Sequence, residues 1–372
     1  MTNNQSKRSV TRRQALAGLS LGAVAAAAPL STPALAQGKR QWKMVTSWPR
    51  NLPGPGLHAQ TLADRITKLT AGRIEVKLYA AGELVPGRGV FDAVSQGTAE
   101  LYHSVPAYWG SKFIGIELFG SQPGGLTADE QLGWMEYGGG QALYSETYAR
   151  FGMRPFLCGN SGPQMAGWYR KEINSPDDFK GMKFRTAGLN LKMMTNMGAT
   201  VQAMGGRAMF QALQNGVLDA GEFVGPWTDS ALGFYQVAPY YYAPGFGEPS
   251  SSEECSINLK AYNDLPDDLK FAVQIACESL YAPVTNEYLT NNAKALPKLV
   301  KEKNVKLKML PENVLVAMGN AAGEVIAELR GHSDELVRRT VESYLAYRKI
   351  VVPYRRYSDN GVMNARYLNF KY

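Results

Sequence analysis

The sequence predicts an α/β protein with two domains and long C-terminal helices. Its 372 residues are enough for two hydrophobic cores. Extended and helical patterns alternate over most of the chain before Pro266, as they do in folds that place helices on the faces of a sheet. Apolar residues make up 45% and charged residues 19% of the chain, a composition typical of a globular protein that argues against disorder.

The first unit alternates strand and helix. Residues 39–48 are rich in β-forming side chains, and residues 57–69 carry apolar residues at helical spacing. Residues 73–82 alternate between apolar and polar side chains, which is typical of a half-buried strand. A short amphipathic helix at 90–101 leads to a further strand, LYHSV. The order β-α-β-α-β predicts a parallel sheet with helices on its faces.

A second unit begins near residue 160. Residues 173–188 predict a turn, a short strand and the start of a helix, and β character returns at 253–260. From Pro266 onward the pattern is mostly helical. The predicted organisation is as follows: domain I from 37–160 together with approximately 250–290, domain II from 161–249, and C-terminal helices over 291–372. We expect these last helices either to pack across the domains or to form a dimer interface.

The N-terminus has the features of an export signal. A basic region ends at Arg12 and Arg13, an apolar run follows from Ala15, and Ala34-Leu35-Ala36 forms a cleavage box. The apolar run is too short to span a bilayer. The paired arginines in SVTRRQALAG favour the twin-arginine (Tat) route, although Ala15 stands where Phe is preferred. The sequence therefore predicts that residues 1–36 are removed after export to the periplasm.

The charge of the mature chain argues against a nucleic-acid partner. The formal net charge is +8, but residues 1–36 contain four basic residues and no acid, so their removal leaves about +4. No basic helix is interleaved with stacking aromatic residues. The lysine-rich segment 298–310 is interpreted as a solvated helix end and turn.

Cys158, Cys255 and Cys277 form neither a disulfide framework nor a zinc site. Their number is odd and no CxxC spacing occurs. We expect buried free thiols, and one disulfide with a spare thiol is the alternative.

The sequence argues against an enzyme. His58, His103 and His332 lack the spacing of a metal pair, and the chain contains no GxSxG elbow, no P-loop and no GxGxxG after a strand. Glu222 and Glu248 could be read as a glycosidase-like carboxylate pair. A secreted ligand-binding protein explains the chain more simply.

Two polar side chains stand where a ligand could be bound. Arg185 ends a predicted strand in KFRTAGLN, a position from which a guanidinium can pair with a carboxylate through two parallel hydrogen bonds. A surface salt bridge is the alternative interpretation of Arg185. Gln164 follows a Gly-Pro turn and offers an amide oxygen where the chain crosses between the two units.

Three segments carry a specific resemblance: PQMAGWY (163–169), MKFRTAGLN (182–190) and the block at 219–249 that contains GEFVGPW and PGFGEP. From about residue 40 the chain resembles the solute-binding subunits of TRAP transporters, the DctP-type family. It is most similar to the branch that binds 2-oxo acids and related monocarboxylates with a metal cation. The resemblance implies a two-domain periplasmic-binding-protein-like fold whose hinge lies near residues 160 and 250. It also implies delivery to small and large membrane subunits.

The resemblance also implies roles for individual residues. Arg185 would pair with the ligand carboxylate. The implied cation ligands are Gln164, Glu222, the backbone carbonyl of Phe223, and Glu248. Residues that would also contact the ligand are Gln164, Asn190, Trp227 and Tyr102. Carboxylate, amide and carbonyl oxygens suit Na⁺ or Ca²⁺ and do not suit zinc or copper.

The charges agree with a cation between protein and ligand. Two glutamates and a ligand carboxylate against one arginine leave two negative charges, which a divalent ion would neutralise fully and a monovalent ion by half. Helix N-termini add positive potential, so both ions remain open. A 2-oxo or 2-hydroxy acid fits because its carboxylate and adjacent oxygen can chelate one ion.

Several alternatives remain open from the sequence. The ligand could be a dicarboxylate or a sugar acid bound without metal, although the two glutamates would then be unhelpful. A secreted lyase or hydrolase that uses Glu222 and Glu248 is a further alternative. The C-terminal region around AYRKIVVPYRRY could support a helix-swapped homodimer, as in some members of the branch that the chain resembles, and a monomer is the alternative.

Overall fold

The computed structural model describes residues 1–2 and 38–371, and the predicted export signal, its cleavage box and its paired arginines lie outside the described residues. The chain divides into two compact units, Met1–Gly38 and Lys39–Tyr372, and all secondary structure reported below belongs to the second. Across residues 38–371, no helix is both long enough and apolar enough to cross a membrane.

The strands are β1 (Arg40–Thr46), β2 (Ile74–Tyr79), β3 (Leu101–Ser104), β4 (Met153–Asn160), β5 (Gly167–Tyr169), β6 (Lys183–Arg185), β7 (Thr200–Gln202), β8 (Ala220–Gly221), β9 (Tyr240–Ala243), β10 (Ser252–Asn258) and β11 (Lys306–Met309). The α-helices are α1 (Pro55–Leu69), α2 (Val90–Ser95), α3 (Ala128–Tyr137), α4 (Gly140–Ala149), α5 (Asn190–Asn196), α6 (Gly206–Gln214), α7 (Pro226–Leu232), α8 (Leu259–Asn263), α9 (Asp267–Glu278), α10 (Tyr281–Glu302), α11 (Glu312–Arg330), α12 (Glu335–Arg355) and α13 (Asp359–Arg366). Short 3₁₀ helices are η2 (Pro106–Tyr108), η3 (Ile114–Phe119), η4 (Pro176–Phe179) and η5 (Phe234–Gln236).

The first sheet has the strand order β2-β1-β3-β10-β4. Strands β2, β1 and β3 are parallel, which confirms the sheet expected from the β-α-β-α-β pattern, and β10 pairs antiparallel with β3 and β4. Leu62 of α1 and Val273 of α9 pack in the core on one face, whereas Trp134 of α3 and Tyr144 of α4 pack in the core on the other. Helices therefore cover both faces of this sheet.

The second sheet has the order β11-β9-β5-β8-β6-β7. Consecutive aromatic residues on its strands face opposite cores: Trp168 packs with α6, and Tyr169 packs with α5 and α11. The edge strand β11 corrects one expectation, because Lys306–Met309 lies in the segment interpreted as a solvated helix end and turn. Its side chains are all exposed and include two lysines, a pattern that suits a sheet edge.

Three connections join the sheets: β4 to β5, β9 to β10, and β10 to β11 through α8, α9 and α10. The first two lie side by side, because Ser161 N donates to Ser251 O at 2.9 Å and Gly245 N donates to Gln164 O at 3.1 Å. A Cβ at Gly245 would lie 2.4 Å from Gln164 O, so the contact requires glycine. These two connections contain the positions near 160 and 250 where a hinge is expected. The domain boundaries themselves stay a prediction.

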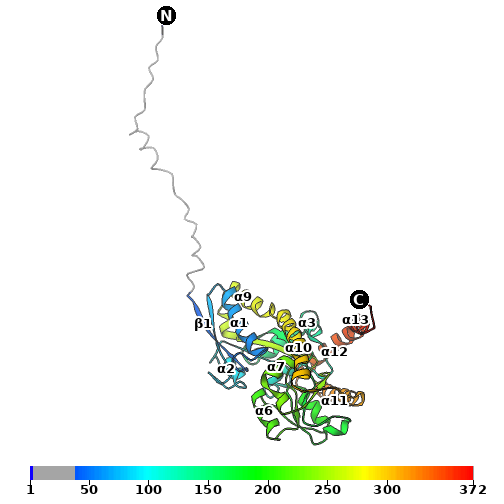
Figure 1. The fold of residues 1–372 in the computed structure, drawn as a ribbon. Coiled ribbons are helices and arrows are strands. Elements are labelled where there is room, and N and C mark those ends of the chain that lie inside the picture. Colours follow the sequence, from blue (N-terminus) through cyan, green and yellow to red (C-terminus); the bar gives the residue numbers. More distant parts are fainter. Residues whose placement is uncertain (3–37, 372) are drawn as a thin grey trace. The chain divides into compact units, whose positions relative to one another are not determined.

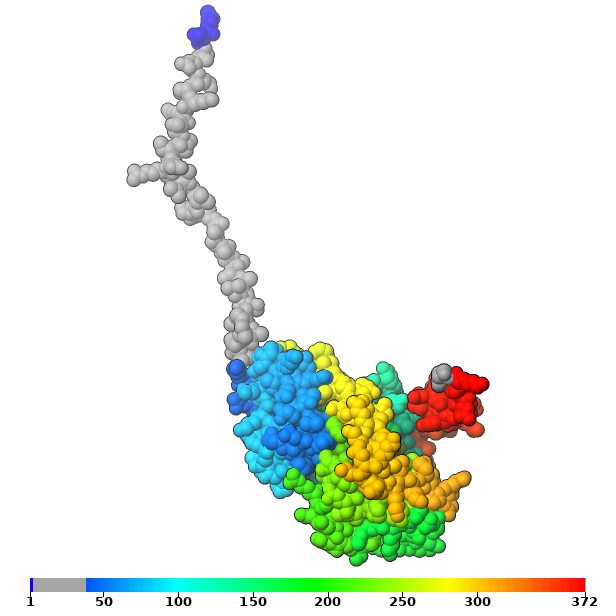
Figure 2. Space-filling model, viewed as in Figure 1, coloured from blue at the N-terminus to red at the C-terminus, as the bar shows by residue number. Residues whose placement is uncertain are grey.

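The C-terminal helices contact both cores. In Figure 1, α10 runs between the end that contains α1 and α9 and the end that contains α6 and α11. Helix α12 places Tyr344 in the core of the first sheet and Val341 in a core of the second. The last helices, red in Figure 2, stand out from the body and expose Tyr354 and Tyr367.

The three cysteines are free thiols, and all of them are buried in the core beside α1, α9 and α10. This placement confirms the expectation of buried free thiols over a disulfide.

Candidate carboxylate-binding site

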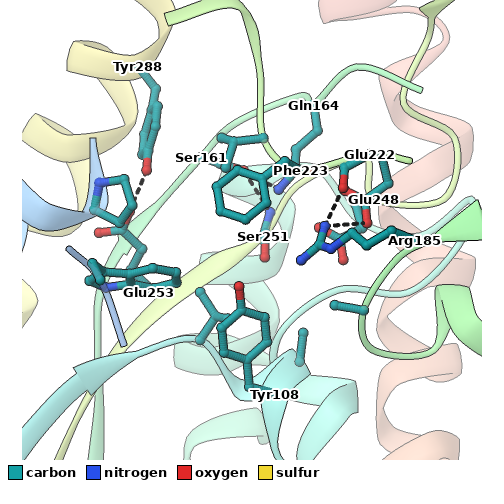
Figure 3. Close-up of a pocket in the computed structure, with 16 residues that line it drawn as sticks. Tyr108, Ser161, Gln164, Arg185, Glu222, Phe223, Glu248, Ser251, Glu253 and Tyr288 are labelled. Carbon is teal, nitrogen blue, oxygen red and sulfur yellow. Dashed lines mark hydrogen bonds and ion pairs between the residues drawn. The ribbon is translucent and has the colours of Figure 1, made fainter. Parts of the chain in front are cut away.

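A cavity lies where β6 and β8 end and the first two inter-sheet connections pass. Arg185 is the last residue of β6, and it pairs in parallel register with Gly221, which ends β8 just before Glu222. Gln164 lies in the first connection and Glu248 in the second. The cavity is lined by all four of these polar residues and by Phe223 (Figure 3). The structure therefore brings together five of the residues named from the sequence.

Arg185 is buried and its guanidinium is held from two directions. Its Nε donates to Met204 O at 2.9 Å, and its Nη1 donates to the backbone carbonyl of Glu222. Nη1 also lies 3.3 Å from Glu222 Oε1, and the Phe223 ring centroid is 4.9 Å from the guanidinium carbon. These contacts fix the plane of the guanidinium at the cavity wall and exclude the alternative of a surface salt bridge.

Glu222 is oriented through a chain of hydrogen bonds. Thr186 donates its hydroxyl to Glu222 Oε1 at 2.7 Å, and Asn190 Nδ2 donates to the Thr186 hydroxyl at 2.8 Å. The other carboxylate oxygen, Oε2, is buried without a hydrogen-bond partner among the described residues. Burial raises the pKa of Glu222, although Arg185 and Thr186 act in the opposite direction.

Glu248 is brought to the site by two glycines of PGFGEP. Besides Gly245, a Cβ at Gly247 would lie 2.4 Å from the amide atoms of Asn190. Burial raises the pKa of Glu248 well above its ordinary value, and the charge of Glu222 adds to this effect. A buried carboxylate whose pKa is raised by a neighbouring carboxylate is poised to share a positive charge with that neighbour.

The corner after Glu222 is fixed by a buried carboxylate. Asp229 on α7 accepts hydrogen bonds from Val224 N at 3.2 Å, from Trp168 Nε1 at 3.0 Å and from the Tyr241 hydroxyl at 2.8 Å. Burial raises the pKa of Asp229 to about 7. Because Val224 follows Phe223 directly, this network sets the direction of the Phe223 backbone.

The other residues named from the sequence lie outside this cavity. Asn190 lines a neighbouring cavity behind Glu222 and Glu248. Trp227 belongs to α7, and its ring centroid is 5.9 Å from that of Tyr288 on α10. Tyr102 is fully buried in the first sheet and donates its hydroxyl to Glu254 at 2.9 Å. The structure thus does not bring Trp227 or Tyr102 to the cavity that contains Arg185.

The opposite wall of the cavity carries residues that the sequence did not single out. Glu253, Tyr288 and Trp48 line it, and Glu253 is contacted by His58 and His103 from behind. Neither histidine has an acidic partner nearby in sequence, and only the fold brings Glu253 to them. The one signal was the pair of adjacent acids in SSSEECS, a strand in which charged side chains are unexpected.

The residues present fit a hard cation. Gln164 Oε1, like Glu222 Oε2, is buried without a hydrogen-bond partner in the described part of the chain, although Gln164 Nε2 donates to Ser161 at 3.2 Å. Both oxygens are acceptors, and Glu248 adds a second carboxylate. Over residues 38–371 no group of three or more His, Cys, Asp or Glu side chains could hold a metal ion. This result is compatible with a site that combines only two carboxylates with an amide and a backbone carbonyl.

Comparison with known proteins gives consistent results. The model for bacterial extracellular solute-binding protein family 7, DctP, matches residues 45–331. The chain is 35% identical over 324 residues to a monocarboxylate 2-oxoacid-binding periplasmic protein of Nostoc sp. (strain PCC 7120), covering 87% of this chain and 88% of that protein.

Two crystal structures of TRAP solute-binding proteins have nearly the same fold. A protein from Bordetella bronchiseptica RB50 has a TM-score of 0.86 and is 32% identical. The match covers 89% of this chain and 98% of that protein. Its crystal contains a mixed-occupancy dimer with calcium and picolinate in one site. A protein from Pseudoalteromonas atlantica T6c with bound sodium and pyruvate has a TM-score of 0.85 and is 31% identical. The match covers 90% of this chain and 100% of that protein. The chain therefore belongs to family 7 of the bacterial extracellular solute-binding proteins, the DctP family, and shares the two-domain α/β fold of TRAP periplasmic binding proteins.

Proposed function

We propose that this protein is the solute-binding subunit of a TRAP-type transporter and that it captures a small 2-oxo or 2-hydroxy monocarboxylate together with Na⁺ or Ca²⁺. The observation that carries the proposal concerns two buried oxygens, Gln164 Oε1 and Glu222 Oε2, which share one cavity with Glu248 and Arg185 and have no hydrogen-bond partner among residues 38–371. The relatives that bind pyruvate with sodium, or picolinate with calcium, support it.

Arg185 is the proposed partner of the ligand carboxylate. Its Nε and Nη1 are used by Met204 and Glu222, so Nη2 is the donor that can face a ligand. A guanidinium whose plane is already fixed loses little conformational entropy on binding. Arg185 therefore orients the acid within the cavity.

Gln164, Glu222, Glu248 and the backbone carbonyl of Phe223 are the proposed cation ligands. When bound, the cation supplies positive charge that offsets the two glutamates and accepts a carboxylate oxygen and the adjacent keto or hydroxyl oxygen of the ligand. Without it, two buried carboxylates would repel an anion by several kcal/mol. For this reason we favour this function over metal-independent binding of a dicarboxylate or sugar acid.

Calorimetric titration tests this function. Metal-free protein is titrated with pyruvate, 2-oxobutyrate and lactate in buffer that contains Na⁺, Ca²⁺ or neither. We expect binding only with one of the cations, and a comparison of the two identifies which ion is used. Equal affinity without either cation would contradict the bridging role.

Capture and delivery require no chemical turnover, and the proteins of this family are solute-binding receptors. We infer that the ligand is released unchanged to the small and large membrane subunits. Incubation of the protein with candidate acids, followed by product analysis, tests this inference. Formation of any product would favour the lyase or hydrolase alternative.

We also infer a homodimer formed through the C-terminal helices. Ile350, Tyr354, Val362, Tyr367 and Leu368 expose between 59% and 85% of their surface, and the Bordetella relative crystallised as a dimer. Exposed apolar side chains concentrated in one segment are typical of an interface. Light scattering should give a dimer for the wild type and a monomer for Tyr354→Glu; a monomeric wild type would contradict the inference.

Export to the periplasm by the Tat route remains part of the proposal. Replacement of both Arg12 and Arg13 by Lys should leave the precursor in the cytoplasm, because Tat recognition depends on this pair. Unchanged export of the double variant would point to a different route.

A further inference from the structure

The cavity has two walls. One carries Arg185, Glu222 and Glu248, and the other carries the carboxylate of Glu253. In Figure 3, Arg185, Glu222 and Glu248 lie on one side of the cavity, whereas Glu253 and Tyr288 lie on the other. A ligand whose carboxylate pairs with Arg185 would therefore have Glu253 across the cavity from that carboxylate.

Glu253 is 2% exposed, and three polar side chains surround its carboxylate. The Tyr288 hydroxyl donates to Oε1 at 2.7 Å, His58 Nδ1 lies 2.9 Å from Oε2, and His103 Nε2 lies 3.3 Å from Oε2. Burial alone would raise the pKa of Glu253, but His58 and His103 outweigh it and the pKa lies well below its ordinary range.

The cluster around Glu253 carries a net negative charge. Trp48 Nε1 donates to His103 Nδ1 at 2.9 Å, so His103 has its proton on Nε2 and is neutral. Burial alone would lower the pKa of His58, but Glu253 and Glu287 raise it above its ordinary value. His58 Nε2 also lies 3.4 Å from Glu287, so one imidazolium stands between two carboxylates.

The donors around Glu253 are directed away from a ligand. The Tyr288 hydroxyl and both histidines point to Glu253 or Glu287, and the indole of Trp48 points to His103. A carboxylate on the ligand tail would meet a negative charge and no free donor among these side chains. The proposed cation compensates only the charges on the opposite wall.

We propose that Glu253 restricts the site to acids with an uncharged tail and excludes ligands with a second carboxylate. The inference rests on the proposed function and adds a specificity-determining residue to it. The repulsion energy between two like charges is far larger in a desolvated cavity than in water. Glu253 can therefore exclude a ligand with a second carboxylate even when the cavity is large enough for that ligand.

The chain provides a matched control in Glu254, the next residue of β10. The strand register shifts between Glu253 and Glu254, and the two side chains have different surroundings. Glu254 accepts hydrogen bonds in the core from Tyr102, Trp109, Tyr144 and Tyr148. Both glutamates are at most 2% exposed. Replacing either one by Gln removes one buried charge from the same strand, but only Glu253 lines the cavity.

The experiment measures Kd by calorimetry, with the required cation present, for two ligand pairs: 2-oxobutyrate with oxaloacetate, and 2-oxovalerate with 2-oxoglutarate. Within each pair the carbon skeleton is the same and a terminal methyl is replaced by a carboxylate. Wild type and E254Q should prefer the monocarboxylate by at least about tenfold. In E253Q we expect this preference to fall below about threefold, through tighter binding of the dicarboxylate.

A second measurement needs no variant, so it also decides the case in which E253Q fails to fold. The wild type should bind the 5-methyl ester of 2-oxoglutarate at least about tenfold more tightly than 2-oxoglutarate, although the ester is larger. Equally weak binding of the ester and the acid would show that the size of the ligand decides its affinity. An unchanged preference of folded E253Q for the monocarboxylate would show that Glu253 does not set this preference. Either result would overturn this inference and leave the proposed function standing. Failure of every 2-oxo monocarboxylate to bind would overturn the proposed function and this inference with it.

Discussion

Arg185 and Glu222 form a buried ion pair in which Nη1 lies 3.3 Å from Oε1 while the same nitrogen also donates to the backbone carbonyl of Glu222. The pair ties the end of β6 to the end of β8. It satisfies one oxygen of Glu222 and leaves Oε2 without a partner among the described residues. A buried carboxylate oxygen normally accepts a hydrogen bond or binds an ion. The free oxygen of Glu222 belongs to a side chain that lines the cavity together with Gln164 and Glu248.

Glu222→Gln should weaken ligand binding by weakening cation binding. The amide keeps an oxygen for the Thr186 hydroxyl and the size of the side chain, but it removes one of the two anionic ligands. We expect Kd for pyruvate in the presence of the cation to rise at least about tenfold, with little change in the unfolding temperature. Titration of wild type and variant at several cation concentrations measures the effect. A variant that binds like the wild type would show that Glu222 is not a cation ligand.

Arg185→Lys should lower ligand affinity while preserving the charge. An ammonium cannot reproduce the planar set of donors that contacts Met204, Glu222 and a ligand carboxylate at once. We expect an affinity loss of at least about tenfold, or about 1.4 kcal/mol. Arg330→Lys, which changes an exposed pair with Glu342, is the control and should bind normally. Retained affinity in Arg185→Lys would show that ligand binding does not depend on a planar guanidinium.

Gly247→Ala should disturb both stability and binding. The added Cβ would lie 2.4 Å from the amide of Asn190, which is held by Thr186, so the connection that carries Glu248 must shift. We expect a loss of about 1–3 kcal/mol of unfolding free energy together with weaker binding. In Gly323→Ala on α11 the new methyl meets nothing within 4 Å, and helix propensity should raise stability by about 0.5–1 kcal/mol. Similar behaviour of the two variants in chemical unfolding and titration would contradict the close-approach argument.

Glu117 should make stability depend on pH. Burial raises the pKa of this glutamate from 4.5 to about 8, so the folded state keeps its proton where the unfolded state loses it. The stabilising contribution is therefore complete below pH 4.5 and declines as the pH rises toward 8, at most about 1.4 kcal/mol per pH unit. Thermal unfolding from pH 5 to 8 measures the slope, and Glu117→Gln should reduce it. An identical slope in the variant would assign the pH dependence to other groups.

The sequence predicted the elements that depend on local pattern. The alternation at 73–82 and the helical spacing at 57–69 specify β2 and α1, because burial of one face needs only the right period. The position of Arg185 at the end of a strand was likewise readable from KFRTAGLN. The strand β11 was missed, since four exposed residues with two lysines give no hydrophobic pattern.

By itself, the sequence determined the α/β class and marked Arg185 and two unusual glutamates as candidate site residues. The resemblance implied their common role and added the ligand class. Only the tertiary structure placed Tyr102 in a core on Glu254 and Glu253 at the ligand cavity, with His58 and His103 behind it. The reason is physical: periodicity fixes which face of a strand is buried, whereas contacts between residues far apart in sequence depend on how the two sheets and their connections pack. The acid in GEFVGPW was visible in the chain, but the carboxylate on the opposite wall became a candidate for specificity only once the fold placed it there.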